Sequence, residues 1–267
     1  MSAVLETWEA ERVDRVLEGG RTMPIVAECI QVESIDNLKF NAETERFVVK
    51  GIGNPHVEEF SLFNEVVGNL LAARLGLITP EPALIKITPE FARAASSTLG
   101  RHGFSLEPGI ASGSVYLGSG LIPPTPEMIS GDRVDQIARI YAFDLLVQNP
   151  DRRADKPNCL YQKENIIAFD FELCFSFVLA IGASDPCDFS KHGIARKHFF
   201  RAALSRCAVD WRPFLKSLAA LTDAEIEAMI KAVPVEWQQF APKIEEHLKF
   251  MTRQSDRIEL ELQRSLL

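Results

Sequence analysis

The stretch that most constrains the fold runs from residue 133 to residue 177. Apolar residues recur at helical spacing from Ile137 to Leu146, and the pattern stops before Pro150, because the residue that precedes a proline is pushed out of the α-helical region. Beyond the charged loop PDRRADKPN, two short apolar runs flank a polar turn at residues 162–165, which is the pattern of a β-hairpin. The sequence therefore predicts a helix, a charged loop and a hairpin in direct succession.

Three short side chains that carry oxygen lie at the ends of these elements, namely Asp151, Asn158 and Asp170. Rigid flanking elements can direct such side chains into one cleft. Carboxylate and amide oxygens suit Mg²⁺, and the order Asp, Asn, Asp is that of the protein-kinase template. Asn158 follows Asp151 by seven residues, two more than in the eukaryotic signature. A surface turn explains Asn-Pro-Asp-Arg equally well on these residues alone.

A resemblance to a known family rests on two segments, NPDRRADKPNCLY and AFDFELCFSF. They resemble the HipA-like kinases, in the branch whose loop reads Asn-Pro-Asp-Arg, and are distantly similar to phosphatidylinositol kinases. The resemblance extends from about residue 19 to about residue 177. It implies an α+β, two-lobed protein-kinase-like fold with a small β-rich N-lobe and a mainly helical C-lobe, and it implies ATP and Mg²⁺ as cofactors.

The resemblance also implies roles for the loop residues. Asp151 is expected to orient the acceptor hydroxyl and to take its proton, while Asn158 and Asp170 hold the metal. Arg152, next to the base, is expected to pair with Asp170 or with the transferred phosphate. Many relatives place an Asn five residues after the aspartate, where this chain has Lys156. Whether Lys156 or Asn158 occupies the metal position therefore stays open, and we assign Asn158.

A lysine ends the β-branched run Phe47–Lys50. A buried lysine is costly unless it is paired, and kinases use such a strand lysine to contact nucleotide phosphates and to pair with a helix glutamate. An amphipathic helix follows and is expected to stop at Gly76, with Glu65 in its first turns. We expect Lys50 and Glu65 to pair and to bind nucleotide. The ordinary alternative for Glu65 is a solvated position near the helix N-terminus.

Two further segments are candidate nucleotide contacts. Gly20, Arg21 and Thr22 lie between a helix predicted over residues 4–18 and a strand predicted from Pro24 to Cys29, where backbone amides can approach phosphate. A helix stop followed by a strand start explains the same residues.

Tyr116 and Leu117 are adenine contacts by position, because they precede a segment rich in Gly, Pro and Ser that is typical of a linker. We place the domain boundary there, with the N-lobe at residues 1–120 and the C-lobe at residues 121–267.

The last third of the chain predicts helices. They are expected over residues 201–208, 211–221, 222–232 and 242–262, with a capping box that begins at Thr222. Glu172 follows the metal aspartate where a protein kinase has glycine, so it is a candidate for a further acid at the metal. His198 has no acidic partner at ligand spacing and is expected at the surface or in a loop.

Composition excludes several classes. The net charge of −8 over 267 residues argues against a DNA-binding groove. No window approaches 18 apolar residues, so no membrane segment is expected. Five cysteines without C-x-x-C spacing are typical of reduced thiols in a cytoplasmic protein.

The sequence thus predicts a kinase that transfers the γ-phosphate of ATP to a Ser/Thr hydroxyl of a protein, its own chain included. Two alternatives stay open. One is a small-molecule or lipid kinase on the same fold, because the acceptor is not labelled by any motif. The other is a catalytically silent kinase-fold module that binds an antitoxin-like partner.

Overall fold

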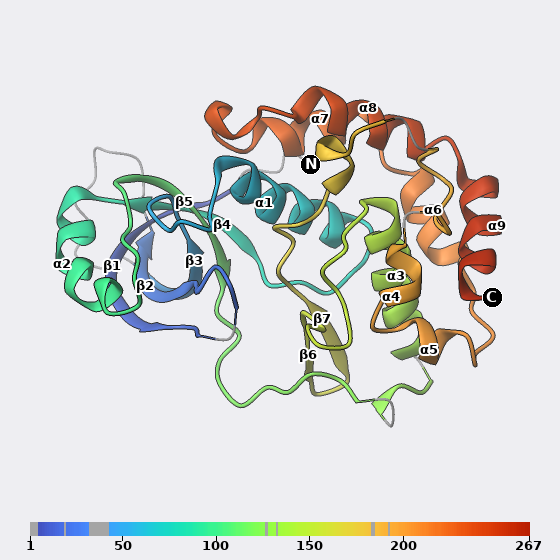
Figure 1. Cartoon of the computed structure of the whole chain (residues 1–267), viewed down its shortest axis with the longest axis horizontal. Helices are drawn as coiled ribbons and strands as arrows, with labels where there is room; N and C mark the ends of the chain where they lie inside the picture. Colours follow the sequence, from blue (N-terminus) through green and yellow to red (C-terminus); the bar gives the residue numbers. More distant parts are fainter. Residues whose placement is uncertain are drawn as a thin grey trace.

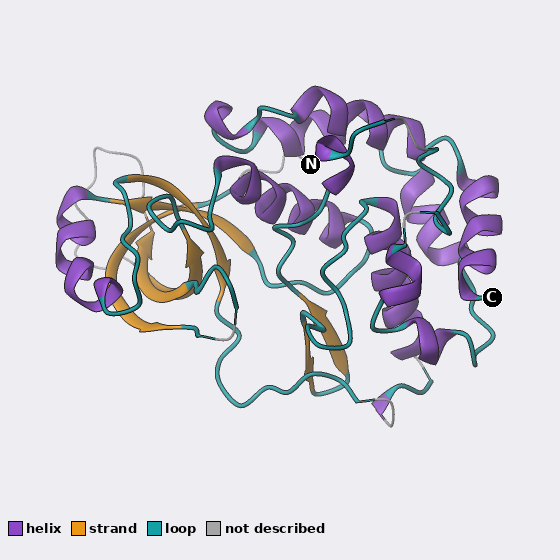
Figure 2. Cartoon of the chain, in the orientation of Figure 1, coloured by secondary structure: helices purple, strands orange, loops and turns teal. Residues whose placement is uncertain are grey.

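The computed structural model describes residues 5–18, 20–31, 43–125, 128–131, 133–182, 185–191 and 193–267. Within these ranges the chain is a mixed α+β protein, with a sheet-rich N-terminal part and a helical C-terminal part (Figures 1 and 2). None of the helices in the described ranges is long and apolar enough to cross a membrane.

The N-terminal part is a closed five-stranded barrel with the strand order β1-β2-β3-β5-β4. Neighbouring strands are antiparallel, except that β1 closes the barrel parallel to β4. Inward-facing apolar residues, among them Trp8, Phe47 and Ile85, fill its interior. The strands are β1 (Thr7–Val16), β2 (Ile25–Gln31), β3 (Thr44–Lys50), β4 (Pro82–Ile87) and β5 (Gly109–Val115), and a helix, α2 (Pro89–Gly100), lies against β1.

The helix predicted over residues 4–18 is wrong where the structure describes it, because Thr7–Val16 forms strand β1. Its acidic residues favour a helix in isolation, but Trp8 and Ala10 alternate with more exposed neighbours and face the barrel interior. Pairing with β2 on one side and β4 on the other decides the conformation, since tertiary context overrides local propensity.

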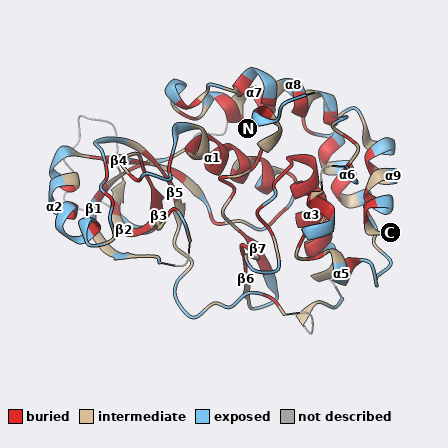
Figure 3. Ribbon diagram, in the orientation of Figure 1, coloured by how far each residue is buried: buried red, intermediate tan, exposed pale blue. Residues whose placement is uncertain are grey.

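Helix α1 (Glu59–Arg74) lies between the barrel and the C-terminal helices (Figure 1). Its apolar side chains, Leu62 and Val66 among them, belong to the same core as α3 (Arg133–Leu146). Both helices are largely buried (Figure 3). The chain leaves α1 through Gly76, whose φ of +86° favours glycine, as the sequence predicts.

The predicted hairpin is present as β6 (Cys159–Gln162) and β7 (Asn165–Ala168), with Cys159 opposite Ala168. The predicted capping box is present as well, at Thr222 and Glu225. The remaining helical elements are η2 (Ser176–Leu179), α4 (Ile194–Lys197), α5 (Arg201–Leu204), α6 (Arg212–Ala219), α7 (Asp223–Lys231), η3 (Val235–Trp237), α8 (Ala241–Met251) and α9 (Ser255–Leu266).

Two helix predictions near the C-terminus are wrong in extent. The helix expected over residues 201–208 ends at Leu204, and the one expected over 242–262 is divided into α8 and α9 by a turn at residues 252–254. The turn lets α9 pack against α6 while α8 packs against α7, so both apolar faces reach the core. The domain boundary at residue 120 stays a prediction.

Candidate active site

A cleft of about 420 Å³ lies between the barrel and the helical part. The barrel contributes Val48 and Lys50 to its wall, and the C-terminal part contributes Asn158, Leu160 and Asp170. Residues far apart in the sequence therefore meet in one cavity, and most of the residues predicted to form a site lie in or next to it.

Lys50 ends strand β3 and is buried among three carboxylates. Its Nζ lies 2.8 Å from Glu65 Oε2 and 2.6 Å from Asp170 Oδ1, and donates a hydrogen bond to each. Glu172 Oε2 lies 3.0 Å away. Burial by itself lowers the pKa of Lys50, but the carboxylates, Asp170 first, more than offset it and raise that pKa well above its usual value. The lysine is a fixed positive charge in this cleft.

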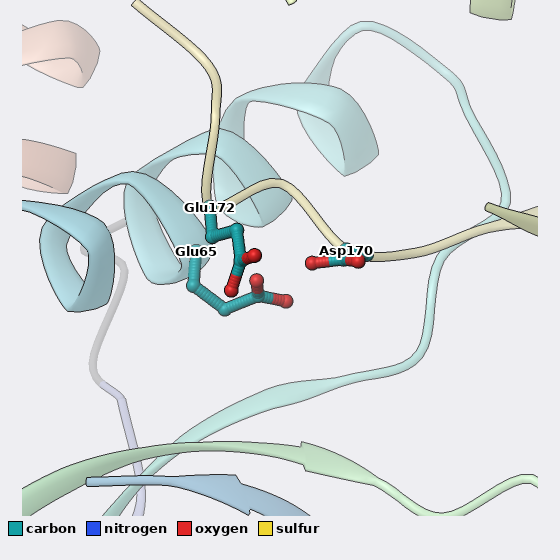
Figure 4. A group of neighbouring side chains, drawn as sticks. All are labelled: Glu65, Asp170 and Glu172. Atoms are coloured by element: carbon teal, nitrogen blue, oxygen red, sulfur yellow. The ribbon is translucent and has the colours of Figure 1, made fainter. Parts of the chain in front are cut away.

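Glu65 projects from α1 and is the partner that the sequence predicted for Lys50 (Figure 4). Its Oε2 also accepts a hydrogen bond from the backbone N–H of Phe171 at 3.2 Å. Burial raises the pKa of Glu65, although Lys50 acts to lower it. Glu65 therefore connects the barrel lysine to the backbone of the segment that carries Asp170 and Glu172.

Asp170 follows β7 in the left-handed region, with a φ of +62°. Its Oδ1 faces Lys50, and its Oδ2 lies 3.0 Å from Lys156 Nζ. Burial raises the pKa of Asp170, but Lys50 and then Lys156 outweigh burial and lower this pKa to about 2. Asp170 is thus a carboxylate at neutral pH, as a metal ligand must be.

Asp151 lies in the loop before β6 and is buried. Its Oδ2 accepts hydrogen bonds from Asn158 Nδ2 at 3.0 Å and from Lys156 Nζ at 2.5 Å. The structure therefore brings Asp151, Asn158 and Asp170 together, with Lys156 between the two aspartates. The sequence left open whether Lys156 or Asn158 occupies the metal position, and the structure places both side chains against Asp151.

Arg152 differs from expectation. Its side chain is fully buried and pairs with Asp144 at 2.6 Å, not with Asp170. It also donates to the backbone carbonyls of Pro157 and Asn158. Arg152 therefore stabilises the loop from the side that faces the core. A buried guanidinium needs several acceptors, and Asp144 on α3 supplies the negative counter-charge.

His198, expected at the surface or in a loop, follows α4 and is buried, so the surface position is wrong. Its ring is buried, and Nε2 lies 2.9 Å from Oδ2 of Asp144. Burial lowers the pKa of His198, although Asp144 acts to raise it. Sequence spacing did not reveal this pair, since 54 residues separate its members.

Most of the predicted nucleotide contacts line the cleft. Gly20, Thr22, Tyr116 and Leu117 lie on its wall, whereas Arg21 is exposed and is not among the residues that form it. The backbone oxygen of Thr22 accepts a hydrogen bond from Asn54 at 2.6 Å, which fixes this turn against the loop after β3.

The donor set in the cleft fits a hard divalent cation. Glu65, Asp170 and Glu172 each offer a carboxylate oxygen, and these atoms lie within 4.8 Å of one another (Figure 4). Glu172 Oε2 is buried and accepts no hydrogen bond from any described residue. It pairs with Lys50 at 3.0 Å, and because no hydrogen bond engages it, it can still bind a cation, so Glu172 is a candidate ligand for Mg²⁺.

A strand lysine paired with a helix glutamate, and an aspartate after a hairpin, are parts of the phosphoryl-transfer template of protein kinases. The fold and the site thus define a kinase-like phosphotransferase. Sequence comparison agrees, because the model of the HipA-like kinase family matches residues 40–265. The chain belongs to the HipA-like kinase family.

Among solved structures, the chain is similar to the Helicobacter pylori proinflammatory kinase CtkA. The two are 14% identical, the similarity covers 96% of each chain, and the TM-score is 0.48. No curated protein matches the chain.

Proposed function

We propose that this protein is an ATP-dependent kinase with a two-lobed kinase fold, which transfers the γ-phosphate to a Ser/Thr hydroxyl of a protein. The observation that supports it most strongly is the position of Lys50, whose ammonium lies within 3.0 Å of Glu65, Asp170 and Glu172. Nucleotide phosphates and their metal need such a pairing of fixed cation and acids.

In this proposal each residue has a defined task. Asp151 takes the proton of the acceptor hydroxyl, whose oxygen forms the new bond to the γ-phosphorus while the bond from that phosphorus to the β–γ bridging oxygen breaks. Lys50, held by Glu65, binds the phosphates. Asp170, Glu172 and Asn158 hold Mg²⁺, which supplies charge neutralisation at the β- and γ-phosphates when it is bound.

The test is transfer of labelled phosphate from ATP to a lysate or to the chain itself. Asp151→Asn is expected to keep the thermal shift that a non-hydrolysable ATP analogue causes, yet to lose at least about a hundredfold in rate, the usual contribution of a general base. Asp170→Asn is expected to lose the metal-dependent rate. A matched control is Asp210→Asn, at an exposed aspartate that pairs with Arg212.

Transfer at the parental rate by both Asp151→Asn and Asp170→Asn would refute the proposal. Label on a lipid or on a small molecule, with none on protein, would assign a different acceptor class. Nucleotide binding without any transfer would indicate the silent binding module instead.

A further inference from the structure

Lys156 is fixed by contacts of its backbone and of its ammonium. It lies in the loop between α3 and β6, and its backbone exchanges two hydrogen bonds with Arg153, at 3.0 and 3.1 Å. Its side chain is partly covered, with 29% exposed. The conformation of the loop therefore restricts where the ammonium group can lie.

The ammonium of Lys156 bridges Asp151 of the catalytic loop and Asp170 after the hairpin. It lies 2.5 Å from Asp151 Oδ2 and 3.0 Å from Asp170 Oδ2. In the kinase template two Mg²⁺ ions are used, and the loop asparagine and the aspartate after the hairpin hold them. Lys156 stands at the sequence position of that asparagine, and its ammonium lies 3.0 Å from Asp170, which corresponds to the other metal ligand of the template.

Charge and donors in the cleft match this arrangement. The carboxylates of Glu65, Asp151, Asp170 and Glu172 face the ammonium groups of Lys50 and Lys156. Four acids and two lysines leave a formal charge of −2 on these protein groups, so the cleft still attracts a cation. On the Lys50 side of Asp170, Glu172 Oε2 pairs with Lys50 at 3.0 Å, and Glu65, Asp170 and Glu172 offer the carboxylate oxygens of one ion site. Lys156 lies on the other side of Asp170.

We infer that Lys156 replaces the second divalent ion of this kinase, so that one metal ion per chain accompanies the nucleotide and the lysine neutralises charge between Asp151 and the transferred phosphate. The inference rests on the proposed function, whose nucleotide it requires. A lysine carries one charge on a flexible stem with three donors, which suits it to contact two carboxylates and a phosphate oxygen in turn.

The test counts metal ions without turnover. Equilibrium dialysis of Mn²⁺ against the protein with an equimolar non-hydrolysable ATP analogue is expected to give one ion per complex for the parent chain. Lys156→Asn, which removes the charge and supplies an amide oxygen, is expected to give two. The matched control is Lys163→Asn in the β6–β7 turn, where the backbone φ of +56° is one that asparagine tolerates, and it should bind one.

A second variant removes the charge of Lys156 without adding an oxygen that could bind metal. Lys156→Met offers no oxygen, so it should bind one Mn²⁺ but hold the analogue about tenfold more weakly, the effect of losing one charge-assisted hydrogen bond. Two ions bound by the parent, one ion bound by Lys156→Asn, or unchanged analogue affinity in Lys156→Met would each overturn the inference.

The outcomes distinguish this inference from the proposed function. A parent chain that transfers phosphate to protein but binds two ions refutes the role of Lys156 alone. A parent chain that binds one ion with the analogue but labels no protein refutes the proposed acceptor and supports the metal count.

Discussion

Lys50 Nζ lies 2.6 Å from Oδ1 of Asp170, a residue 120 positions further along the chain. The contact joins the last residue of a barrel strand to the segment that follows the β6–β7 hairpin. Both groups are largely buried, so the residues proposed to bind nucleotide and metal also contribute to the free energy of unfolding.

Lys50→Met is expected to destabilise the protein by about 3–5 kcal/mol, because it leaves the acids Glu65, Asp170 and Glu172 without their central counter-charge. Urea unfolding measures this difference. Lys86→Met is the matched control: this lysine also lies on a barrel strand, β4, but it is half exposed in its ion pair with Glu9, so the change should stay within about 1 kcal/mol. Equal losses in the two variants would contradict the prediction.

The lowered pKa of Asp170 predicts that the free energy of unfolding falls at acid pH. Its pKa in the folded protein is about 2, below the ordinary 3.8, so the unfolded chain takes up the proton first as pH falls. The stabilisation is fully present above about pH 4 and is lost as pH approaches 2, and its size is on the order of 2–3 kcal/mol. The free energy of unfolding should therefore fall more steeply between about pH 5 and pH 2.5 in the parent than in Asp170→Asn. Parallel curves for the two proteins would show that Asp170 is not the group responsible.

Arg152 and its neighbour Arg153 provide a matched pair. Arg152→Met removes the buried partner of Asp144 and should cost about 3–5 kcal/mol. Arg153→Met removes an exposed pair with Asp155 and should change the unfolding free energy by no more than about 0.5 kcal/mol. Chemical unfolding of both variants checks the difference. A small effect at Arg152 would mean that the loop does not depend on this guanidinium.

Gly68 sets the distance between α1 and the segment after Asp170. A Cβ at this position would lie 2.9 Å from Phe171 Cβ, so Gly68→Ala should displace that segment, cost about 1–3 kcal/mol and slow phosphate transfer. Gly100 ends α2, and a Cβ added there would meet no heavy atom within 4 Å, so Gly100→Ala should leave transfer unchanged and stabilise slightly. Thermal unfolding and the transfer rate test both variants. Unchanged transfer in Gly68→Ala would show that the segment tolerates the shift.

Local sequence patterns determined those turns and helix ends that depend only on residues a few positions apart. The stop of α1 at Gly76, the capping box at Thr222 and the turn between β6 and β7 follow from backbone preferences and short-range hydrogen bonds. The resemblance to kinases placed Lys50, Asp151 and Asp170 in one site, and the structure brings them together.

Only the tertiary structure decided the features that depend on partners distant in sequence. Strand β1 forms because β2 and β4 pair with it, against the helical preference of its acidic residues. Arg152 turns to Asp144 on α3, and Lys156 reaches across to Asp170. The physical reason is the same in each case: the free energy of a buried charge or of a β-strand depends on which partner the fold brings to it, and a single sequence does not state that partner.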